Sequence, residues 1–364
     1  MQFSFDGDNI DFQYNIEGYI SIIEISERKR LLVEGIDDKK FFEIFQNKLP
    51  LSFKFDIDTA QDINSTPPLG NCQIVEKISQ EISNQSYSYK FVGFVDREFR
   101  GFDSVTLTDN LRCHKQDRRL IWSRGHSIEN YFFDRQMLCE FLRESFTLKC
   151  HHESVKLFDN SFSQILFIAC AIGLAGDKSG KLRIISETVH SDLFEFQGEN
   201  LVLKIDEFRE RLIVRKKLTD QETSIIIDSY QTYLNKLTVV DLETIQWLCD
   251  GHIGLDSIWA AYSCCVLTTT SKIRKNMQRQ LKDIEDRIQN IQDGEEENLK
   301  FKKTLEKLKE DIKINDPKKQ AEKIFDIPKN NRFQGLTYCL LIKVNSSKCV
   351  YPLEVFRLLE EIQT

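Results

Sequence analysis

The chain has 364 residues, 41% of them hydrophobic, and a formal net charge of −7 at neutral pH. This length and hydrophobic content allow at least one substantial core, and two at the usual size of a domain. The negative charge argues against a protein that coats nucleic acid without specificity, but it leaves open an enzyme whose acids a metal neutralises. No apolar stretch reaches the ~18 residues of a membrane helix, and no signal-peptide pattern is recognisable, so we expect a cytoplasmic protein without membrane association.

The first part of the chain predicts alternating helices and strands. Short apolar runs rich in Val, Leu and Phe are typical of a parallel sheet that is covered on both faces. The predicted helices are 16–28, a helix from Asp38, and 72–84, and the predicted strands are 30–34, 53–58, 90–95 and 119–123. This βαβαβ order predicts an α/β fold with right-handed crossovers.

From about residue 151 the pattern becomes helical. Phe162–Leu174 is mostly apolar and predicts a buried helix, and the segments 199–216 and 239–267 continue the helical pattern. In 272–314, apolar residues recur at steps of four and three on both sides of a polar break, which predicts an antiparallel coiled-coil hairpin. We therefore expect four consecutive parts. These are a catalytic domain over 1–150, a helical subdomain over 151–270, the hairpin over 271–316, and a C-terminal segment over 317–364 that packs on the body.

Two acidic motifs follow apolar runs. Leu31-Leu32-Val33 leads into Glu34-Gly35-Ile36-Asp37-Asp38, and Phe94-Val95 leads into Asp96-Arg97-Glu98. Because ligands of such sheets bind at the carboxyl ends of the strands, these acids should converge. Carboxylates without a basic partner repel one another, so we expect a cation, and hard oxygen ligands favour Mg²⁺ or Mn²⁺. An alternative for Asp37 and Asp38 is that they stabilise the start of the following helix, which leaves Glu34 and Asp96 unexplained.

The same residues resemble a known family. Glu34-Gly35-x-x-Asp38 and Asp96-x-Glu98 are similar to the two motifs of Toprim domains, which topoisomerases, primases and overcoming-lysogenization-defect nucleases share. His126-Ser127-Ile128-Glu129-Asn130-Tyr131-Phe132 is similar to a segment of the Toprim-like family that includes the PARIS phage-defence effector AriB. The resemblance covers residues 28–135, with a weaker Gly251-His252 element further on. One departure is Glu98, where Toprim domains usually have a second aspartate.

This resemblance implies a metal-dependent nuclease. Glu34 and Asp96 would hold one or two Mg²⁺ or Mn²⁺ ions, and Asp38, Glu98 and Glu129 would complete the site directly or through water. Glu34 could instead act as a general acid or base. The resemblance also implies a role as the toxic effector of an anti-phage defence system, under the control of a partner ABC-type ATPase. The implied substrate is RNA, with tRNA favoured over DNA, and the implied assembly is a homodimer.

Basic residues between the motifs are candidates for binding nucleic acid. Arg118, Arg119 and Arg124 lie close in the chain to the proposed site, although a solvated loop and strand edge explains them equally well. His252 is a weaker candidate, since a core or capping histidine is the commoner reason for such a residue.

Two other classes of function remain open. A topoisomerase or primase shares the acidic motifs, but the catalytic tyrosine domain of the first and the zinc module of the second are not recognisable. A non-catalytic binding module would have lost its metal and would use the hairpin to dock a partner. The ten cysteines include no CxxC pair and predict reduced thiols, several of them buried, in place of a zinc site.

Overall fold

The computed structural model describes residues 2–6, 9–49, 54–146, 150–290 and 295–345. The described chain forms two compact units, each discontinuous in sequence. Unit 1 comprises Met1–Met137, Lys236–Gly251 and Pro328–Thr364, and unit 2 comprises Leu138–Asn235 and His252–Ile327. The sequence led us to expect four parts that follow one another along the chain. The structure instead has two units, and the chain passes from one to the other several times.

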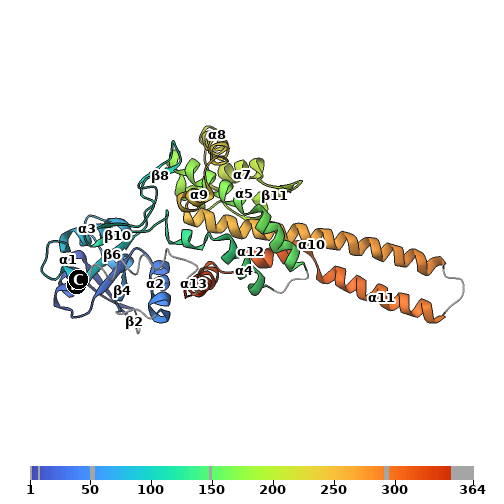
Figure 1. The fold of residues 1–364 in the computed structure, drawn as a ribbon, viewed down its shortest axis with the longest axis horizontal. Coiled ribbons are helices and arrows are strands. Elements are labelled where there is room, and N and C mark those ends of the chain that lie inside the picture. Colours follow the sequence, from blue (N-terminus) through green and yellow to red (C-terminus); the bar gives the residue numbers. More distant parts are fainter. Residues whose placement is uncertain (1, 7–8, 50–53, 147–149, 291–294, 346–364) are drawn as a thin grey trace. The chain divides into compact units, whose positions relative to one another are not determined.

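Unit 1 is built on a five-stranded sheet of order β4-β3-β6-β10-β9 (Figure 1). Four of its strands are parallel, and the edge strand β9 runs antiparallel to β10. The strands are β3 (Arg30–Val33), β4 (Asp56–Thr59), β6 (Phe91–Val95), β9 (Lys115–Asp117) and β10 (Leu120–Trp122). All five residues of β6 are buried, as expected for the central strand of a sheet covered on both faces.

Helices cover both faces of this sheet. Gly93 of β6 faces α3 (Asn71–Ile82), because a Cβ added at Gly93 would lie 2.4 Å from the Ser79 hydroxyl. The next residue, Phe94, points to the opposite face, where its ring packs 4.9 Å from that of Phe42 in α2 (Ile36–Lys48). Consequently, α3 can approach β6 closely only because residue 93 has no side chain.

The remaining elements of unit 1 are short or lie at its margins. The helix α1 (Ile16–Ile25) joins the core on the α3 face, and α13 (Lys329–Asn345) packs against α2. The others are β1 (Gln2–Asp6), β2 (Asn9–Asn15), η1 (Ala60–Asp62), β5 (Ile63–Asn64), η2 (Ser88–Lys90), β7 (Phe102–Asp103), β8 (Thr108–Asp109), η3 (Ile128–Phe132) and α9 (Leu242–Leu248).

Unit 2 is mainly helical. Its central helix, α5 (His151–Lys178), contains the predicted buried segment Phe162–Leu174. By length and composition α5 could also cross a membrane, but 67% of its most apolar window is buried inside the protein, as in the core helix of a globular unit. The other elements are α4 (Arg135–Ser145), α6 (Leu182–Ser186), η4 (Ser191–Leu193), β11 (Phe194–Gln197), β12 (Asn200–Leu203), α7 (Ile205–Glu210), a π-helical turn (Arg211–Arg215), α8 (Asp220–Leu237) and α12 (Pro317–Phe325).

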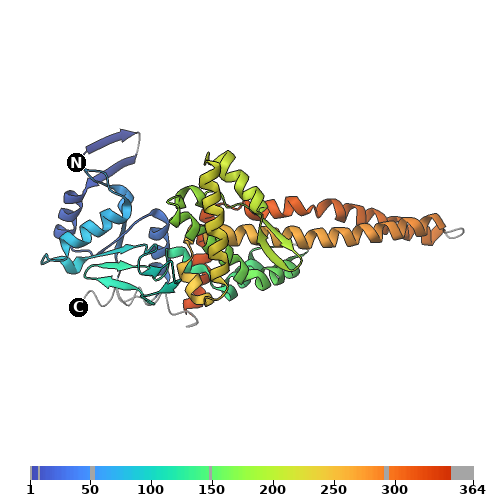
Figure 2. The ribbon, with the colours of Figure 1, turned by 90° about the horizontal axis from the view of Figure 1, so that it is seen from above.

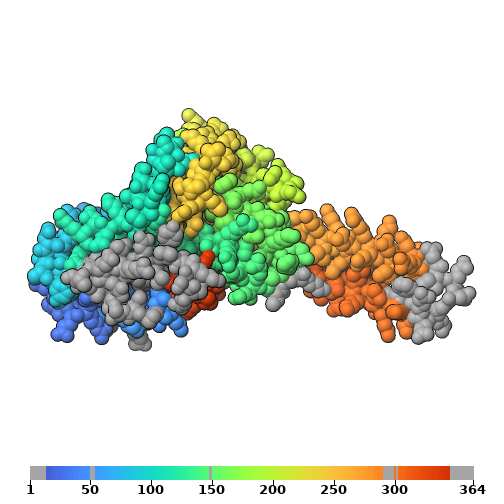
Figure 3. Space-filling view, viewed as in Figure 1, coloured from blue at the N-terminus to red at the C-terminus, as the bar shows by residue number. Residues whose placement is uncertain are grey.

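The predicted hairpin is present, with one change. Its first arm is the end of a single helix, α10 (Gly251–Asn290), and its second arm is α11 (Glu295–Ile314). The two arms run side by side in both ribbon views (Figures 1 and 2) and pack against each other in the space-filling view (Figure 3). Lys309 of one arm pairs with Glu285 of the other at 3.1 Å, and such exposed pairs add little stability.

The sequence predicted most elements but misassigned one segment. Residues 199–216 were expected to be helical, whereas 200–203 form the second strand of the hairpin β11–β12. The turn contains Gly198 with a φ of 66°, a conformation that favours glycine, and Phe194 and Leu203 pair across the strands. The helical pattern expected over 239–267 is present as two helices, α9, which ends at Leu248, and α10, which begins at Gly251.

Candidate active site

Glu34 and Asp96 lie together at the carboxyl edge of the sheet. Each follows the last residue of its strand, and the two strands, β3 and β6, are parallel neighbours. The Glu34 Oε1 atom accepts a hydrogen bond of 2.8 Å from the backbone N–H of Asp96. The predicted convergence of the two motifs is therefore present in the structure.

Asp38 belongs to the first turn of α2. Its Oδ2 atom accepts a hydrogen bond of 3.0 Å from the backbone N–H of Gly35, so it stabilises the start of the helix as the alternative explanation proposed. The residue is also buried, and it lies close enough to Glu34 and Glu129 for their charges to raise its pKa. Asp37, in contrast, points to the surface and pairs with Lys40 at 3.3 Å. Asp38 therefore combines a capping role with membership of the acidic site.

Glu129 reaches the same site from the turn η3. Ser127 precedes this turn, and its hydroxyl donates a hydrogen bond of 2.6 Å to the Glu129 Oε2 atom. The side chain of Asn130 donates to the carbonyl groups of Gln246 and Cys249, at 2.6 and 2.9 Å, and thereby fixes the turn against the end of α9. The segment His126–Phe132 thus holds a buried carboxylate in a defined position.

Gly251, the first residue of α10, packs directly against Glu129. A Cβ added at Gly251 would lie 1.8 Å from the Ser127 Oγ atom and 2.9 Å from the Glu129 Oε2 atom, so no larger residue fits without displacing them. The positive end of a helix next to a carboxylate is a favourable arrangement. The Gly251 element therefore has a structural reason: it allows the start of α10 to approach Glu129.

Glu98 occupies the edge of the site. Its backbone φ is 52°, its side chain is 61% exposed, and its carboxylate lies 3.7 Å from the guanidinium of Arg100. Its charge still contributes to raising the pKa of Glu34 and Asp96. Glu98 is thus the most accessible of the five predicted carboxylates, and Arg100 lies beside it.

Burial and mutual repulsion dominate the electrostatics of the other acids. Burial raises the pKa of Glu34, and the Asp96 N–H partly opposes this effect. Burial together with the charges of Glu129 and Glu34 raises the pKa of Asp38 to about 8. Burial, then the charges of Asp38, Glu34 and Glu129, raise the pKa of Asp96 well above its usual value. A positive charge placed among these acids would relieve the repulsion.

The residues present fit a hard divalent cation in chemistry, although their side chains do not enclose one. The Asp96 Oδ1 atom is buried and has no hydrogen-bond partner, which is costly for an ionised oxygen unless a cation approaches it. Within the described residues, no group of three or more His, Cys, Asp or Glu side chains is close enough together to form a ready ligand set. Glu34, Asp96, Asp38 and Glu129 are the residues that could hold the ion after side-chain rotation.

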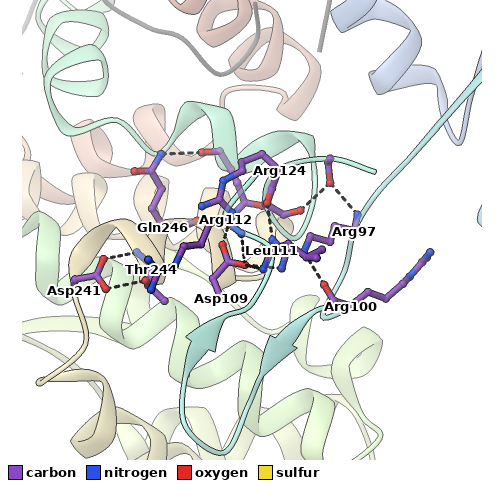
Figure 4. A network of polar contacts seen from close by, with 12 residues as sticks. Arg97, Arg100, Asp109, Leu111, Arg112, Arg124, Asp241, Thr244 and Gln246 are labelled. Carbon is purple, nitrogen blue, oxygen red and sulfur yellow. Dashed lines mark hydrogen bonds and ion pairs between the residues drawn. The ribbon is translucent and has the colours of Figure 1, made fainter. Parts of the chain in front are cut away.

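A buried ion-pair network supports the loop that carries Asp96 (Figure 4). Asp109, at the end of β8, accepts hydrogen bonds from the guanidinium groups of Arg97, at 2.7 Å, and Arg124. Arg97 also donates to the carbonyl groups of Arg100 and Arg124, at 2.6 and 3.0 Å. Burial alone would raise the pKa of Asp109, but the hydrogen bonds that it accepts from Arg97, from the Arg112 N–H and from Arg124 lower it to about 2. Arg97, the residue after Asp96, is thereby immobilised.

The predicted basic residues have different environments. Arg118 is exposed and Arg119 is half-buried, so both can reach a ligand in solution. Arg124 is buried with Asp109, and its role in the structure is to hold the loop, contrary to the expectation that it contacts nucleic acid. His252 is exposed and belongs to unit 2.

Two residues of this region were not assigned to the site from the sequence. His126 and Asp250 are both buried, and their side chains approach each other to 3.7 Å. The His126 N–H donates to the Trp247 carbonyl at 2.8 Å, and the His126 carbonyl accepts from the Glu98 N–H at 2.7 Å. In the sequence, Asp250 directly precedes Gly251, which is the only indication that it belongs to this region. The proximity of His126 and Asp250 depends on the fold and could not be predicted from their positions in the chain.

No protein-family model matches the chain, and no curated protein matches its sequence significantly.

Proposed function

We propose that the chain is a metal-dependent phosphodiester hydrolase whose site is formed by Glu34, Asp38, Asp96 and Glu129, with Glu98 at its edge. The observation that carries the proposal is the buried, unpartnered Oδ1 atom of Asp96, which lies among acids that raise its pKa at the carboxyl edge of a parallel sheet. The strand order and the two acidic motifs support a Toprim-like domain.

The protein's contribution is to hold the acids and to exclude water from part of the site. The carboxylate of Glu34 is held by the backbone N–H of Asp96, that of Asp38 by the backbone N–H of Gly35, and that of Glu129 by the Ser127 hydroxyl. A bound Mg²⁺ or Mn²⁺ would supply charge neutralisation, activation of water and orientation of the scissile phosphate. The exposed Glu98 is suited to contact with water or substrate at the rim.

The test compares cleavage of tRNA, single-stranded RNA, single-stranded DNA and duplex DNA by purified protein, with and without Mn²⁺. Asp96→Asn should abolish cleavage of every substrate that the natural chain cuts. A matched control is Glu81→Gln, which removes an exposed carboxylate of α3 that only approaches Lys77, at 3.9 Å. Undiminished cleavage by Asp96→Asn, or no cleavage of any substrate by the natural chain, would refute the proposal.

The resemblance supports a more specific role within the same proposal. The chain would be the toxic effector of an anti-phage system, RNA and in particular tRNA would be its substrate, and an ABC-type ATPase would control it. Expression of the natural chain alone should then arrest growth, Glu34→Ala should remove the toxicity, and a partner ATPase should suppress it.

A further inference from the structure

A pocket of ≈ 410 Å³ lies on the α3 face of the sheet. This volume is within the range of about 300–1,000 Å³ that is usual for small-ligand sites. Its lining combines polar side chains with one large aromatic ring: Glu76, Ser79, Gln80, Ser83, Asp117, Arg118, Leu120 and Trp122.

The pocket is close in the fold to the acidic edge. Trp122 ends β10 and pairs in register with Val95, the residue that precedes Asp96. The next backbone groups are also joined, because the Ser123 N–H donates to the Val95 carbonyl at 2.9 Å and the Arg97 N–H donates to the Ser123 hydroxyl at 2.8 Å. A strand bound at Asp96 could therefore extend to Trp122 within a short distance.

Arg100 connects the two places. Its guanidinium approaches Glu98 at 3.7 Å, pairs with Glu76 of the pocket, and lies 5.2 Å from the centre of the Trp122 ring. The Lys115 amino group lies 4.1 Å from the same ring. Because Arg100 is engaged with Glu76, Glu98 and the Cys72 thiol, the cations left at the margin of the aromatic ring are Lys115 and the exposed Arg118.

The pocket itself suits a flat ring with polar edges better than a phosphate. The Trp122 side chain is only partly buried and contributes to the pocket lining, so part of its ring faces the pocket. Asp117 and the amide of Gln80 add acceptors and a donor at the rim. Carboxylates in the lining disfavour a phosphate group inside the pocket, whereas the cations at the margin suit phosphates outside it.

We propose that this pocket binds an unpaired nucleobase of the nucleic-acid substrate, which takes the place of the Lys115 amino group on the face of Trp122 while Lys115 and Arg118 contact the adjoining phosphates. Stacking on an aromatic side chain next to a basic groove is a general way of holding single strands. A base in a duplex has no free face for such stacking. The inference rests on the proposed function for the identity of the ligand, and it adds a preference for a single-stranded segment next to the cleaved bond.

The test measures binding of a fluorescently labelled single-stranded RNA to the full chain by anisotropy, in a chelator and in the Asp96→Asn background, so that no cleavage occurs. Trp122→Ala should weaken binding about tenfold or more, the size expected for loss of one stacked base. Trp122→Phe should retain most of the affinity. Tyr89→Ala, which removes a 48% exposed aromatic ring outside the pocket, should leave it unchanged.

Further measurements guard against a merely structural effect. Gln80→Ala alters the rim without touching the core, and it should also weaken binding. A duplex RNA, or a strand of the same length without bases, should bind more weakly than the single strand. Unchanged affinity in Trp122→Ala, or equal binding of the strand without bases, would overturn the inference. Full competition by a free nucleoside monophosphate at the affinity of the whole strand would also overturn it, because the occupant would then be a free nucleotide.

These outcomes are separable from the fate of the hydrolase proposal. If the chain cleaves nucleic acid and Trp122→Ala changes neither KM nor affinity, only the pocket assignment fails. If the chain binds single strands through Trp122 but cleaves none of them, only the hydrolase assignment fails.

Discussion

The backbone N–H of Asp96 donates a 2.8 Å hydrogen bond to the carboxylate of Glu34, across two parallel strands whose sequences are 62 residues apart. This contact makes each acid a part of the other's environment. Glu34 fixes the position of the backbone at Asp96, and its charge adds to burial and to the charge of Asp38 in raising the pKa of Asp96. In the other direction, the Asp96 N–H partly opposes the effect of burial on the pKa of Glu34.

Two substitutions of Glu34 separate these effects. Glu34→Gln keeps an acceptor for the Asp96 N–H but removes the charge, whereas Glu34→Ala removes both. Each should lower cleavage roughly 100-fold or more, because a ligand of the cation is lost. Chemical denaturation should show Glu34→Ala to be less stable than Glu34→Gln by about 1–3 kcal/mol, the cost of leaving a buried N–H unpaired. Equal stability of the two variants would show that the hydrogen bond contributes little.

Removing the carboxyl group of Asp38 should stabilise the chain when no cation is present. Asp38→Asn keeps an oxygen acceptor for the Gly35 N–H. It also removes a group whose pKa is raised from 3.8 to about 8, so that folding no longer requires a proton to be held there above the ordinary pKa of an aspartate. We expect its Tm in chelator to exceed that of the natural chain, and the increase in Tm on adding Mn²⁺ to be smaller. Glu81→Gln is the matched control and should change neither value. A Mn²⁺ response in Asp38→Asn equal to that of the natural chain would remove Asp38 from the ligand set.

The sequence was sufficient to predict the central strands and the meeting of the acids. Buried runs such as 91–95 have the length and composition of covered strands, and an acid that follows such a run must lie at its carboxyl edge. It was insufficient for residues 200–203, where the alternation of a short strand pair is hidden among helical neighbours. The pairing of Arg124 with Asp109 was also not predictable, because an arginine in a polar segment gives no local sign of its burial.

Asp109 should be essential for the loop that carries Asp96. It is buried between Arg97 and Arg124, so Asp109→Asn removes the carboxylate charge that these two buried cations share and should destabilise unit 1 by about 3–5 kcal/mol. Asp103→Asn in the same hairpin is the control, since Asp103 accepts from the backbone N–H groups of Val105 and Thr106 in a surface turn, at 2.8 and 3.1 Å, and from the Thr106 side chain, none of which is a buried cation. Denaturation curves of the two variants check the difference, and similar losses would contradict the assigned role.

The same network predicts a specific dependence of stability on acid. The pKa of Asp109 is lowered from 3.8 to about 2 in the folded chain, first of all by the hydrogen bond from Arg97 acting against burial. A depressed carboxyl pKa contributes stability that is fully present above the unfolded value and is lost as pH falls from 3.8 towards 2. The gap in unfolding free energy between the natural chain and Asp109→Asn should therefore narrow over this interval. A gap that stays constant there would show that the carboxylate charge is not what stabilises the loop.

Gly251 should tolerate no side chain while Ser127 is present. A Cβ at this position would lie 1.8 Å from the Ser127 hydroxyl, so Gly251→Ala should displace Ser127 and Glu129 and lower both Tm and cleavage. In the double variant Gly251→Ala with Ser127→Ala, the closest obstructing atom is removed, and Tm should recover more than cleavage, because Glu129 still lacks its hydroxyl donor. The control is Gly70→Ala, because the added Cβ would lie 3.7 Å from its nearest neighbouring atom, an ordinary contact distance. Gly198→Ala is unsuitable, since the φ of 66° at that residue would add backbone strain. If the single variant Gly251→Ala matched Gly70→Ala in Tm and cleavage, the close approach of α10 to Glu129 would have no functional weight.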